Sequence, residues 1–406
     1  MTSFSVGLLG HGTVGSAFAE LLEARAENIA RTVGRRPELA GVLTRSRGDF
    51  GEILERSDLV VELIGGTEPA REYVLRALEA GRHVVTANKQ LLSQHGEELY
   101  AAAQTAQVQL RFEASVAGVV PAVRVLQETL AVTRIERLHG IVNGTTNYIL
   151  SEMARTHASY EDALAQAQEL GYAEADPTED VTGKYAAAKM AILARLAFGT
   201  PVHLDQVPYE GIEHITPDDL EYAAELNLAL KLIGTAERID GGLSVRVHPV
   251  FLYPGHPLAS VSGPFNAVTV ESPAFTEITM SGPGAGGPQT ATAVLGDVVT
   301  AMIPAPPQVD WTYDLEVVSD ATSAFYLHLE VDDQPGVLGQ IAQVLGLQGI
   351  SVKSVVQKGL GGQARLVMVV HPVLESRFFA AIELIRGLDF VRAAPRAIRV
   401  IEEEFV

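Results

Sequence analysis

Cysteine is absent from this chain of 406 residues. Its absence excludes disulfide-stabilised scaffolds, thiolate zinc sites, iron–sulfur clusters and enzymes that use a thiol nucleophile. A chain without cysteine also fits a reducing compartment. The chain begins with an apolar, strand-like run and has no basic segment before it, so no signal peptide is visible and we expect a cytoplasmic protein.

Basic residues are scarce, with 30 Lys and Arg against 50 Asp and Glu, which gives a net charge of −20. A surface this acidic repels phosphate backbones and anionic lipids, so we expect neither nucleic acid nor a membrane as a partner. Long hydrophobic runs are also lacking. The longest uncharged stretches, residues 247–270 and 278–296, are interrupted by proline, glycine and hydroxyl residues and cannot span a bilayer.

The length corresponds to two to four domains at roughly 150 residues each. Short apolar runs alternate with amphipathic segments near the N-terminus. This alternation predicts a doubly wound, parallel α/β domain of the Rossmann type over residues 1–133, with a return helix at about 285–303. The predicted strands are Phe4–Leu9, Ala40–Thr44, Leu59–Ile64, His83–Ala87 and Val108–Glu113.

Beyond residue 133 the predicted helices and strands come in blocks, with helices to Phe198 and then strands through Val270. Blocks of this kind predict an α+β domain over residues 134–303. The proline-rich start of residues 304–320 reads as a linker. Residues 321–406 follow the order βαββαβ, ending in a strand at Val391–Val400, which predicts a ferredoxin-like module.

Three glycines in GLLGHGTVG have the spacing of a dinucleotide-binding turn. Gly10, Gly12 and Gly15 follow a predicted strand and open a helix. The first permits the tight turn, the second lets backbone approach a pyrophosphate, and the third lets helix pack on strand. The helix N-terminus, with Thr13 and Val14, favours the negative charge. The alternative is a glycine-rich turn with a structural role only.

The end of the second predicted strand indicates the ribose preference. An acidic residue there would bond a 2′-hydroxyl, whereas an arginine suits a 2′-phosphate. The strand leads into Thr44-Arg45-Ser46-Arg47, and the first acid, Asp49, comes after Gly48. We therefore expect NADP, with Arg45 at the phosphate, while NAD is the alternative if both arginines are solvated surface residues.

A lysine on an apolar helix face is the leading candidate for chemistry. Lys189 lies among apolar residues, and Tyr185 precedes it by one turn, so the two side chains can touch. Loss of solvation lowers the pKa of such a lysine toward neutrality and suits it to proton transfer. The alternative is a lysine that extends to solvent. Glu174, in the loop ahead, is either an amine-binding carboxylate or a surface acid.

Asp176-Pro177-Thr178-Glu179 predicts a capping box, a structural role, with Asp176 at the N-cap and Glu179 at the third helical position.

Other segments suit a ligand site. VVTANK ends a strand at Lys89, on the sheet edge where doubly wound folds bind ligands. The segment from Asn143 through Thr145 opens a helix whose N–H groups suit a carboxylate. The glycine-rich loop around Gly284 either approaches the cofactor or is an ordinary loop.

A series of spaced segments covers nearly the whole chain: GLLGHGTVG, VVELIGG, VVTANK, FEASVAG, NGTTNYIL, GYAEADPT, AAAKMAILA and GPGAGG. Together they closely resemble the homoserine dehydrogenase family, and LEVDDQPGVLGQIAQVL resembles the ACT regulatory domain that many of these enzymes carry. The resemblance implies reversible NAD(P)H-dependent reduction of L-aspartate 4-semialdehyde to L-homoserine, in threonine and methionine biosynthesis, by a homodimer or homotetramer with a middle domain for catalysis and dimerisation.

The resemblance also implies roles for single residues. Lys189 is the expected proton donor, Lys89 lies at cofactor and substrate, and Gly171 lies beside both. Glu174 holds the substrate amine, and Asp180 lies near the substrate. A monovalent cation such as sodium is implied at Glu113 and the carbonyls of Val116, Gly118 and Val120. An allosteric amino acid, threonine, is implied near the turn from Asp332 to Gly336, unless that module serves only oligomerisation.

One position departs from the family pattern G-x-D-A-A-x-K. This chain has Tyr185 where that pattern has an aspartate that helps bind homoserine. A tyrosine carries no negative charge at neutral pH, because its pKa is near 10, and so it cannot replace the carboxylate. We expect a working enzyme with altered homoserine affinity.

Two other functions remain open. The first is a degenerate dehydrogenase that senses NADP and an amino acid without turnover, and the second is a reductase of another small carbonyl compound. Oxidation of an aldehyde to an acyl phosphate is excluded, because it proceeds through a thioester and the chain has no cysteine.

Overall fold

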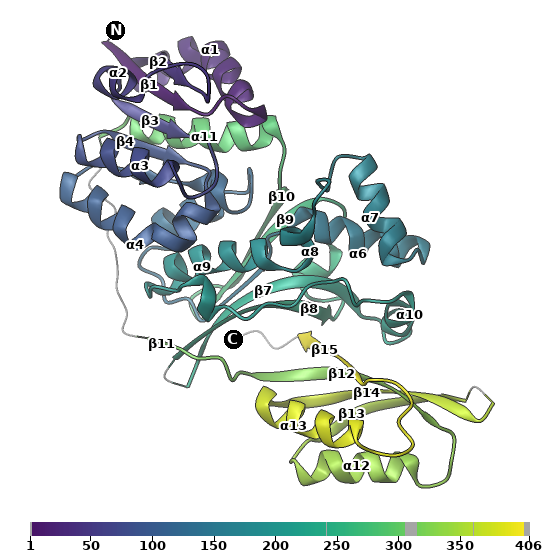
Figure 1. The fold of residues 1–406 in the computed structure, drawn as a ribbon. Helices are drawn as coiled ribbons and strands as arrows, with labels where there is room; N and C mark the ends of the chain where they lie inside the picture. Colours follow the sequence, from purple (N-terminus) through teal and green to yellow (C-terminus); the bar gives the residue numbers. More distant parts are fainter. Residues whose placement is uncertain (1, 241, 305–314, 360, 402–406) are drawn as a thin grey trace.

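Figure 1 shows the chain in a computed structural model, which describes residues 2–240, 242–304, 315–359 and 361–401. An N-terminal α/β domain lies at the top of that view, a sheet covered by helices lies in the middle, and a smaller α/β module lies below it. Among the described residues, no helix combines the length and the apolar character needed to cross a membrane.

The N-terminal sheet has five parallel strands in the order β2-β1-β3-β4-β5. Chain order reverses at β1, which lies between β2 and β3, and doubly wound sheets bind ligands at the carboxyl ends of the strands beside such a reversal. The prediction of a doubly wound α/β fold is confirmed. The strands are β1 Thr2–Leu9, β2 Arg35–Leu43, β3 Leu59–Glu62, β4 His83–Thr86 and β5 Leu110–Arg111.

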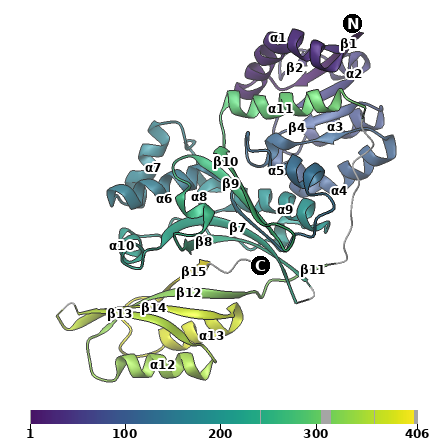
Figure 2. The ribbon, with the colours of Figure 1, turned by 180° about the vertical axis from the view of Figure 1, so that it is seen from behind.

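Helices cover both faces of this sheet. Phe18 of α1 and Val294 of α11 share a core with Val6 and Leu59 on one face. Helix α11 comes from far along the chain, and both views show it crossing the N-terminal domain (Figures 1 and 2), as expected for a return helix. The helices are α1 Thr13–Val33, α2 Phe50–Arg56, α3 Ala70–Glu79, α4 Lys89–Ala106 and α11 Gly287–Ala301.

The middle sheet is antiparallel, in the order β10-β9-β6-β7-β8, and α9 packs its alanine-rich buried face onto it. Its strands are β6 Arg137–Ile141, β7 Ala229–Ile239, β8 Gly242–Leu252, β9 Phe265–Ser272 and β10 Thr276–Pro283. The helices of this region are α5 Ala122–Arg124, α6 Gly144–Thr156, α7 Tyr160–Glu169, α8 Thr178–Val181, α9 Lys184–Phe198 and α10 Pro217–Glu225.

The C-terminal module has the predicted βαββαβ order, and its strands are arranged β15-β12-β14-β13. Strand β15 pairs in parallel with β8, so module and middle domain share one 10-stranded sheet. The sequence did not predict this junction. The elements are β12 Thr322–Asp332, α12 Val337–Leu347, β13 Val352–Gly359, β14 Gln363–Leu374, α13 Glu375–Arg386 and β15 Arg396–Ile401.

The predicted linker, residues 304–320, is described only in part, because residues 305–314 lie outside the described ranges, as do residues 402–406 of the predicted C-terminal module. Within the linker, β11 (Glu316–Val317) pairs with the start of β8. The end of the predicted linker is therefore tied to the middle sheet by backbone hydrogen bonds.

Three local predictions are wrong. The strand expected at Val108–Glu113 is shorter, because a 3₁₀ turn begins at Glu113. The last strand begins at Arg396, and Val391 forms only an isolated bridge. Helix α10 interrupts the region expected to be strands, because Thr216 and Asp219 form a capping box that starts it at Pro217.

Candidate active site

The glycine turn between β1 and α1 fits a diphosphate. Gly10 has a φ of +97°, and a Cβ on Gly15 would lie 2.2 Å from the Gly10 carbonyl oxygen. A Cβ on Gly12, by contrast, would meet no other atom within 4 Å, and Gly12 caps α1 without a side-chain hydrogen bond. The helix N-terminus therefore faces open space with N–H groups available to an anion.

The predicted ribose-binding turn lies beside the glycine turn. The Gly10 N–H donates to the Leu43 carbonyl at 2.9 Å, and the Thr44 N–H donates to the Arg47 carbonyl at 2.8 Å. Arg45 lies at the exposed tip of this turn. The structure thus brings Arg45 to the same edge of the sheet as the glycine turn.

The predicted loop around Gly284 comes from far along the chain and lies against both the start of α1 and the segment that contains Gly118. A Cβ on Gly118 would lie 2.4 Å from the Gly284 carbonyl oxygen, and a Cβ on Gly287 would lie 3.2 Å from Thr13 Cγ2. Close approach of this kind is the reason for glycine at Gly118, where φ is also positive. The loop around Gly284 therefore lies between the start of α1 and the segment proposed to hold a cation.

A buried acid that the sequence analysis did not single out organises the same sheet edge. Glu62 is 0% exposed at the end of β3 and accepts the Thr86 hydroxyl at 2.6 Å and the Ile64 N–H at 2.7 Å. Thr86 in turn accepts the Asn88 N–H at 3.0 Å. This network fixes the backbone that leads into Lys89, and an acid ending a buried apolar strand was the signal in the sequence.

Glu113 uses its carboxylate within the protein. The two oxygens accept the N–H groups of Val123 at 3.0 Å and Arg124 at 2.8 Å. Burial raises the pKa of Glu113 to about 7, and the neighbouring Asp297 adds to the rise while the two N–H groups oppose it. The Val120 carbonyl accepts the Ala122 N–H at 2.8 Å. The side chain of Glu113 therefore holds the start of α5 in place.

Lys189 lies on α9 with its ammonium directed at the end of β6. Its Nζ donates to the Val142 carbonyl at 2.7 Å. Burial lowers the pKa of Lys189 to about 7, the positive charge of Lys89 lowers it further, and Asp180 opposes the change. A lysine with this pKa is present in both protonation states near neutral pH, which is what acid–base catalysis requires.

Lys89 begins α4 and reaches the same place from the other side. Its Nζ lies 3.9 Å from the centroid of the Tyr185 ring. Burial lowers its pKa, while the charges of Asp180, Glu179 and Glu174 act in the opposite direction. The structure therefore gathers both predicted lysines and Tyr185, from α4 and α9, into one group of side chains, here called the lysine cluster.

The acids of α8 have different partners. Asp180 accepts Asn143 Nδ2 at 2.8 Å, so two predicted substrate-binding residues are joined. The capping box is wrong, because Glu179 accepts Lys184 Nζ at 2.6 Å instead of a backbone N–H. A charged partner within reach gives the stronger hydrogen bond. Asp176 still accepts the Thr178 N–H, at 3.2 Å, and α8 begins at Thr178.

The loop before α8 is exposed. Gly171 has a φ of +74°, and the Thr145 hydroxyl donates to the Tyr172 carbonyl at 2.6 Å. The Glu174 carbonyl accepts Gln168 Nε2 at 3.1 Å, and the negative charge of the Glu174 carboxylate acts to raise the pKa values of Lys89 and Tyr185. This loop therefore lies next to the start of α6, which Thr145 ties to it, and close enough to Lys89 for the charge of Glu174 to act on that lysine.

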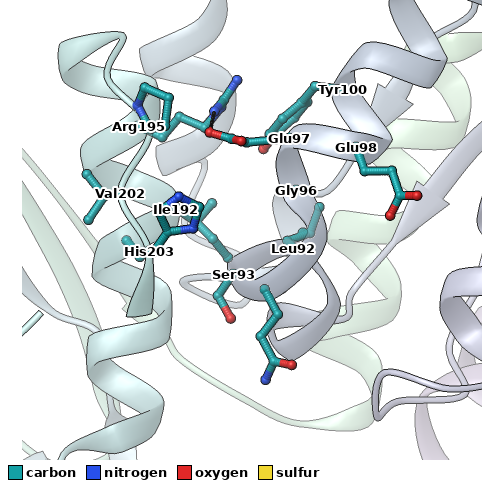
Figure 3. A pocket seen from close by; sticks show the side chains of 13 residues that line it. Leu92, Ser93, Gly96, Glu97, Glu98, Tyr100, Ile192, Arg195, Val202 and His203 are labelled. Carbon is teal, nitrogen blue, oxygen red and sulfur yellow. Dashed lines mark ion pairs between the residues drawn. The ribbon is translucent and has the colours of Figure 1, made fainter. Parts of the chain in front are cut away.

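A separate cavity of about 200 Å³ lies between α4 and α9, further toward their C-terminal ends than the two lysines (Figure 3). Arg195 lies 4.5 Å from the centroid of the Tyr100 ring and 3.8 Å from Glu97 across it. None of the predicted site residues lines this cavity.

Comparisons with known proteins show which family the chain is similar to. Family models match for the homoserine dehydrogenase NAD binding domain at residues 10–113, homoserine dehydrogenase at residues 121–299, and the ACT domain at residues 325–390. A homoserine dehydrogenase of Neisseria gonorrhoeae is 38% identical over 433 residues, which cover 98% of this chain and 99% of the relative.

Solved structures give the same result. A homoserine dehydrogenase from Thiobacillus denitrificans has a TM-score of 0.95 and 39% identity, with 99% of both chains covered. A hyperthermophilic archaeal homoserine dehydrogenase in complex with NADPH has a TM-score of 0.66 and 25% identity, with 76% of this chain and 100% of the other covered. We conclude that the chain belongs to the homoserine dehydrogenase family, NAD(P)-dependent oxidoreductases that act on a CH–OH group.

Proposed function

We propose that the enzyme interconverts L-aspartate 4-semialdehyde and L-homoserine with Lys189 as the proton-transferring residue and NADP as the preferred cofactor. The observation that carries the proposal is the position and pKa of Lys189, about 7, in the lysine cluster, where the charge of Lys89 also acts on it. When bound, the nicotinamide gives or accepts the hydride. The sensor alternative is disfavoured because the chain keeps Lys189, whose lowered pKa suits it to proton transfer.

The cofactor site is assigned to residues near the glycine turn. Its open N–H groups suit the diphosphate, and Arg45 suits a 2′-phosphate, which favours NADP over NAD. The NADPH bound to the archaeal relative supports the same cofactor. The residues assigned are Gly10, Gly12, Thr13, Val14, Gly15, Arg45, Lys89, Gly171 and Gly284.

Lys189 acts in both directions. In reduction, its ammonium donates a proton to the oxygen that becomes the homoserine hydroxyl. In oxidation, its neutral amine accepts the hydroxyl proton. The hydrogen bond to the Val142 carbonyl fixes the position of Nζ, so the proton moves along a defined direction. Lys89 holds a positive charge next to the same oxygen.

The two charged ends of the substrate are assigned to two different sets of residues. Glu174 and Asp180 suit the amine, and Asp180 is oriented by Asn143. The N-terminus of α6, with Asn143 and Thr145, suits the carboxylate because its N–H groups favour negative charge. Gly171 leaves room beside the cofactor, since a Cβ at this position would meet nothing within 4 Å.

A monovalent cation is assigned to the segment that follows Glu113. The cation would be held by the Glu113 carboxylate, which the N–H groups of Val123 and Arg124 orient, and by the backbone carbonyls of Val116, Gly118 and Val120. Carbonyl oxygens suit a hard cation such as Na⁺. The ion would tie this segment to the adjoining loop at Gly284.

The C-terminal ACT domain is assigned a regulatory role, with threonine as effector. The assigned turn contains Gly336, which starts α12 at a φ of +91° without a side-chain cap. Asp332 accepts Arg392 Nε at 2.6 Å, which lowers the pKa of Asp332 and holds the turn. We further propose a homodimer or homotetramer that works in the cytoplasm with small-molecule partners only.

The test is an absorbance assay with purified enzyme, NADPH and L-aspartate 4-semialdehyde. Consumption of NADPH with formation of homoserine supports the proposal. Binding of NADPH and threonine without turnover supports the sensor instead. Turnover of other small carbonyl compounds at higher kcat/KM than the semialdehyde assigns the same chemistry to another substrate.

A further inference from the structure

Tyr185 makes two contacts that the proposed reaction does not use. Its ring lies beneath the Lys89 ammonium, at 3.9 Å from centroid to Nζ. Burial and the neighbouring Glu179 carboxylate both raise the pKa of Tyr185, so its side chain stays uncharged. Tyr185 therefore stands between a lysine and an acid that would otherwise attract each other.

Lys89 is surrounded by acids but is held by none of them. Asp180 and Glu179 on α8 and Glu174 in the preceding loop all raise its pKa, while Lys189 on α9 carries the competing positive charge. Among the described residues Lys89 forms no ion pair. The carboxylate oxygens of Glu179 are taken by Lys184 at 2.6 Å and by Gln90 at 3.3 Å.

We propose that Tyr185 is a positioning residue for Lys89: its ring holds the ammonium beside Lys189 and away from the α8 carboxylates. This inference rests on the proposed function and refines it. An ammonium over an aromatic face is attracted by the ring without being neutralised. Lys89 thus keeps its full charge next to the reacting oxygen.

The arrangement has a consequence for Lys189. A positive charge close to an amine disfavours the protonated form. When the ring is removed, Lys89 is free to move toward the α8 carboxylates and away from Lys189, and the pKa of Lys189 then rises. A carboxylate at position 185 has the same effect more strongly, because it adds a negative charge beside both lysines.

The test compares Tyr185→Phe, which keeps the ring, with Tyr185→Leu, which removes it, and Tyr185→Asp, which adds charge. In homoserine oxidation the rate rises with pH through the pKa of Lys189, about 7 in the unmodified enzyme. We expect Tyr185→Leu to lower kcat about tenfold and move that limb to higher pH, with KM for homoserine changed less than about twofold. Tyr185→Phe should retain most of kcat, and Tyr185→Asp should move the limb furthest.

A second measurement does not depend on turnover. The enzyme is labelled with ¹³C at the lysine ε-carbons, and the Lys189 signal, assigned with Lys189→Arg, is titrated by NMR in each folded variant. A higher pKa of Lys189 in Tyr185→Leu and Tyr185→Asp, but not in Tyr185→Phe, supports the inference. Unchanged titration in all variants, or equal damage from Phe and Leu, overturns it, as does a change confined to KM, which indicates direct substrate contact. Failure of the unmodified enzyme to oxidise homoserine would overturn the proposed function alone.

Discussion

The cofactor edge, which is the glycine turn at the start of α1 with Arg45 and the loop at Gly284, differs from the lysine cluster in the kind of atoms that form it. The cofactor edge consists of backbone, and its glycines Gly12 and Gly15 matter because of the atoms they lack. The lysine cluster consists of side chains from α4 and α9, with the acids of α8 close by, and the pKa of Lys189 depends on its burial and its charged neighbours. The first kind of site is determined by local spacing, whereas the second depends on how distant segments pack.

We expect the largest effect on activity from a substitution in the lysine cluster. Lys189→Ala removes the proton-transferring group, and loss of such a group costs roughly 10²–10⁴ in rate. We expect kcat to fall by that factor while the Kd for NADPH, measured by fluorescence titration, changes less than about threefold, since the glycine turn is untouched.

Lys231 is a matched control, because burial lowers its pKa too, to about 8. It donates to the Val261 carbonyl at 2.6 Å within the middle domain. Lys231→Met should lower Tm and leave kcat of the folded enzyme within about tenfold of the parent. If both substitutions reduced kcat equally, buried lysines in general, and not Lys189 in particular, would be needed, and the assignment would be wrong.

The same contrast explains what the sequence could predict. The strand, the glycine spacing and the helix of the cofactor edge are contiguous, so roles for Gly10, Gly12 and Gly15 follow from the order of residues alone. The βαββαβ order was likewise predictable, because each element has its own periodicity. For Lys189 the apolar helix face indicated a lowered pKa, and the structure agrees in direction and cause.

Contacts between distant segments could not be predicted. The partner of Glu179 is Lys184 and not the backbone, which depends on side-chain reach in the folded state. The Lys89–Tyr185 contact joins α4 to α9. The pairing of β15 with β8 joins two modules that each have a complete sequence signature, so nothing local indicated that they share a sheet.

The next effect tests the backbone side of the comparison. In Gly15→Ala the new Cβ would lie 2.2 Å from the Gly10 carbonyl oxygen, so the turn must shift. Such overpacking costs roughly 1–3 kcal/mol of stability.

In Gly12→Ala the new methyl group meets no protein atom within 4 Å, so Tm should be unchanged. NADPH binding should weaken at least about tenfold, because the methyl group enters the space assigned to the diphosphate. Thermal unfolding and NADPH titration of both variants measure this. Unchanged NADPH affinity in Gly12→Ala would place the diphosphate elsewhere.

The smallest expected effect concerns one exposed side chain at the cofactor edge. Arg45→Ser removes the charge assigned to the 2′-phosphate, and because exposed charge pairs contribute little, the Kd for NADPH should rise only about threefold to tenfold. The Kd for NADH should stay the same, since NADH has no 2′-phosphate. Arg47→Ser, two residues along the same turn, is the control and should change neither value. An equal loss for both cofactors in Arg45→Ser would show that Arg45 supports the turn and does not select the phosphate. The preference for NADPH over NADH would then not come from the Arg45 side chain.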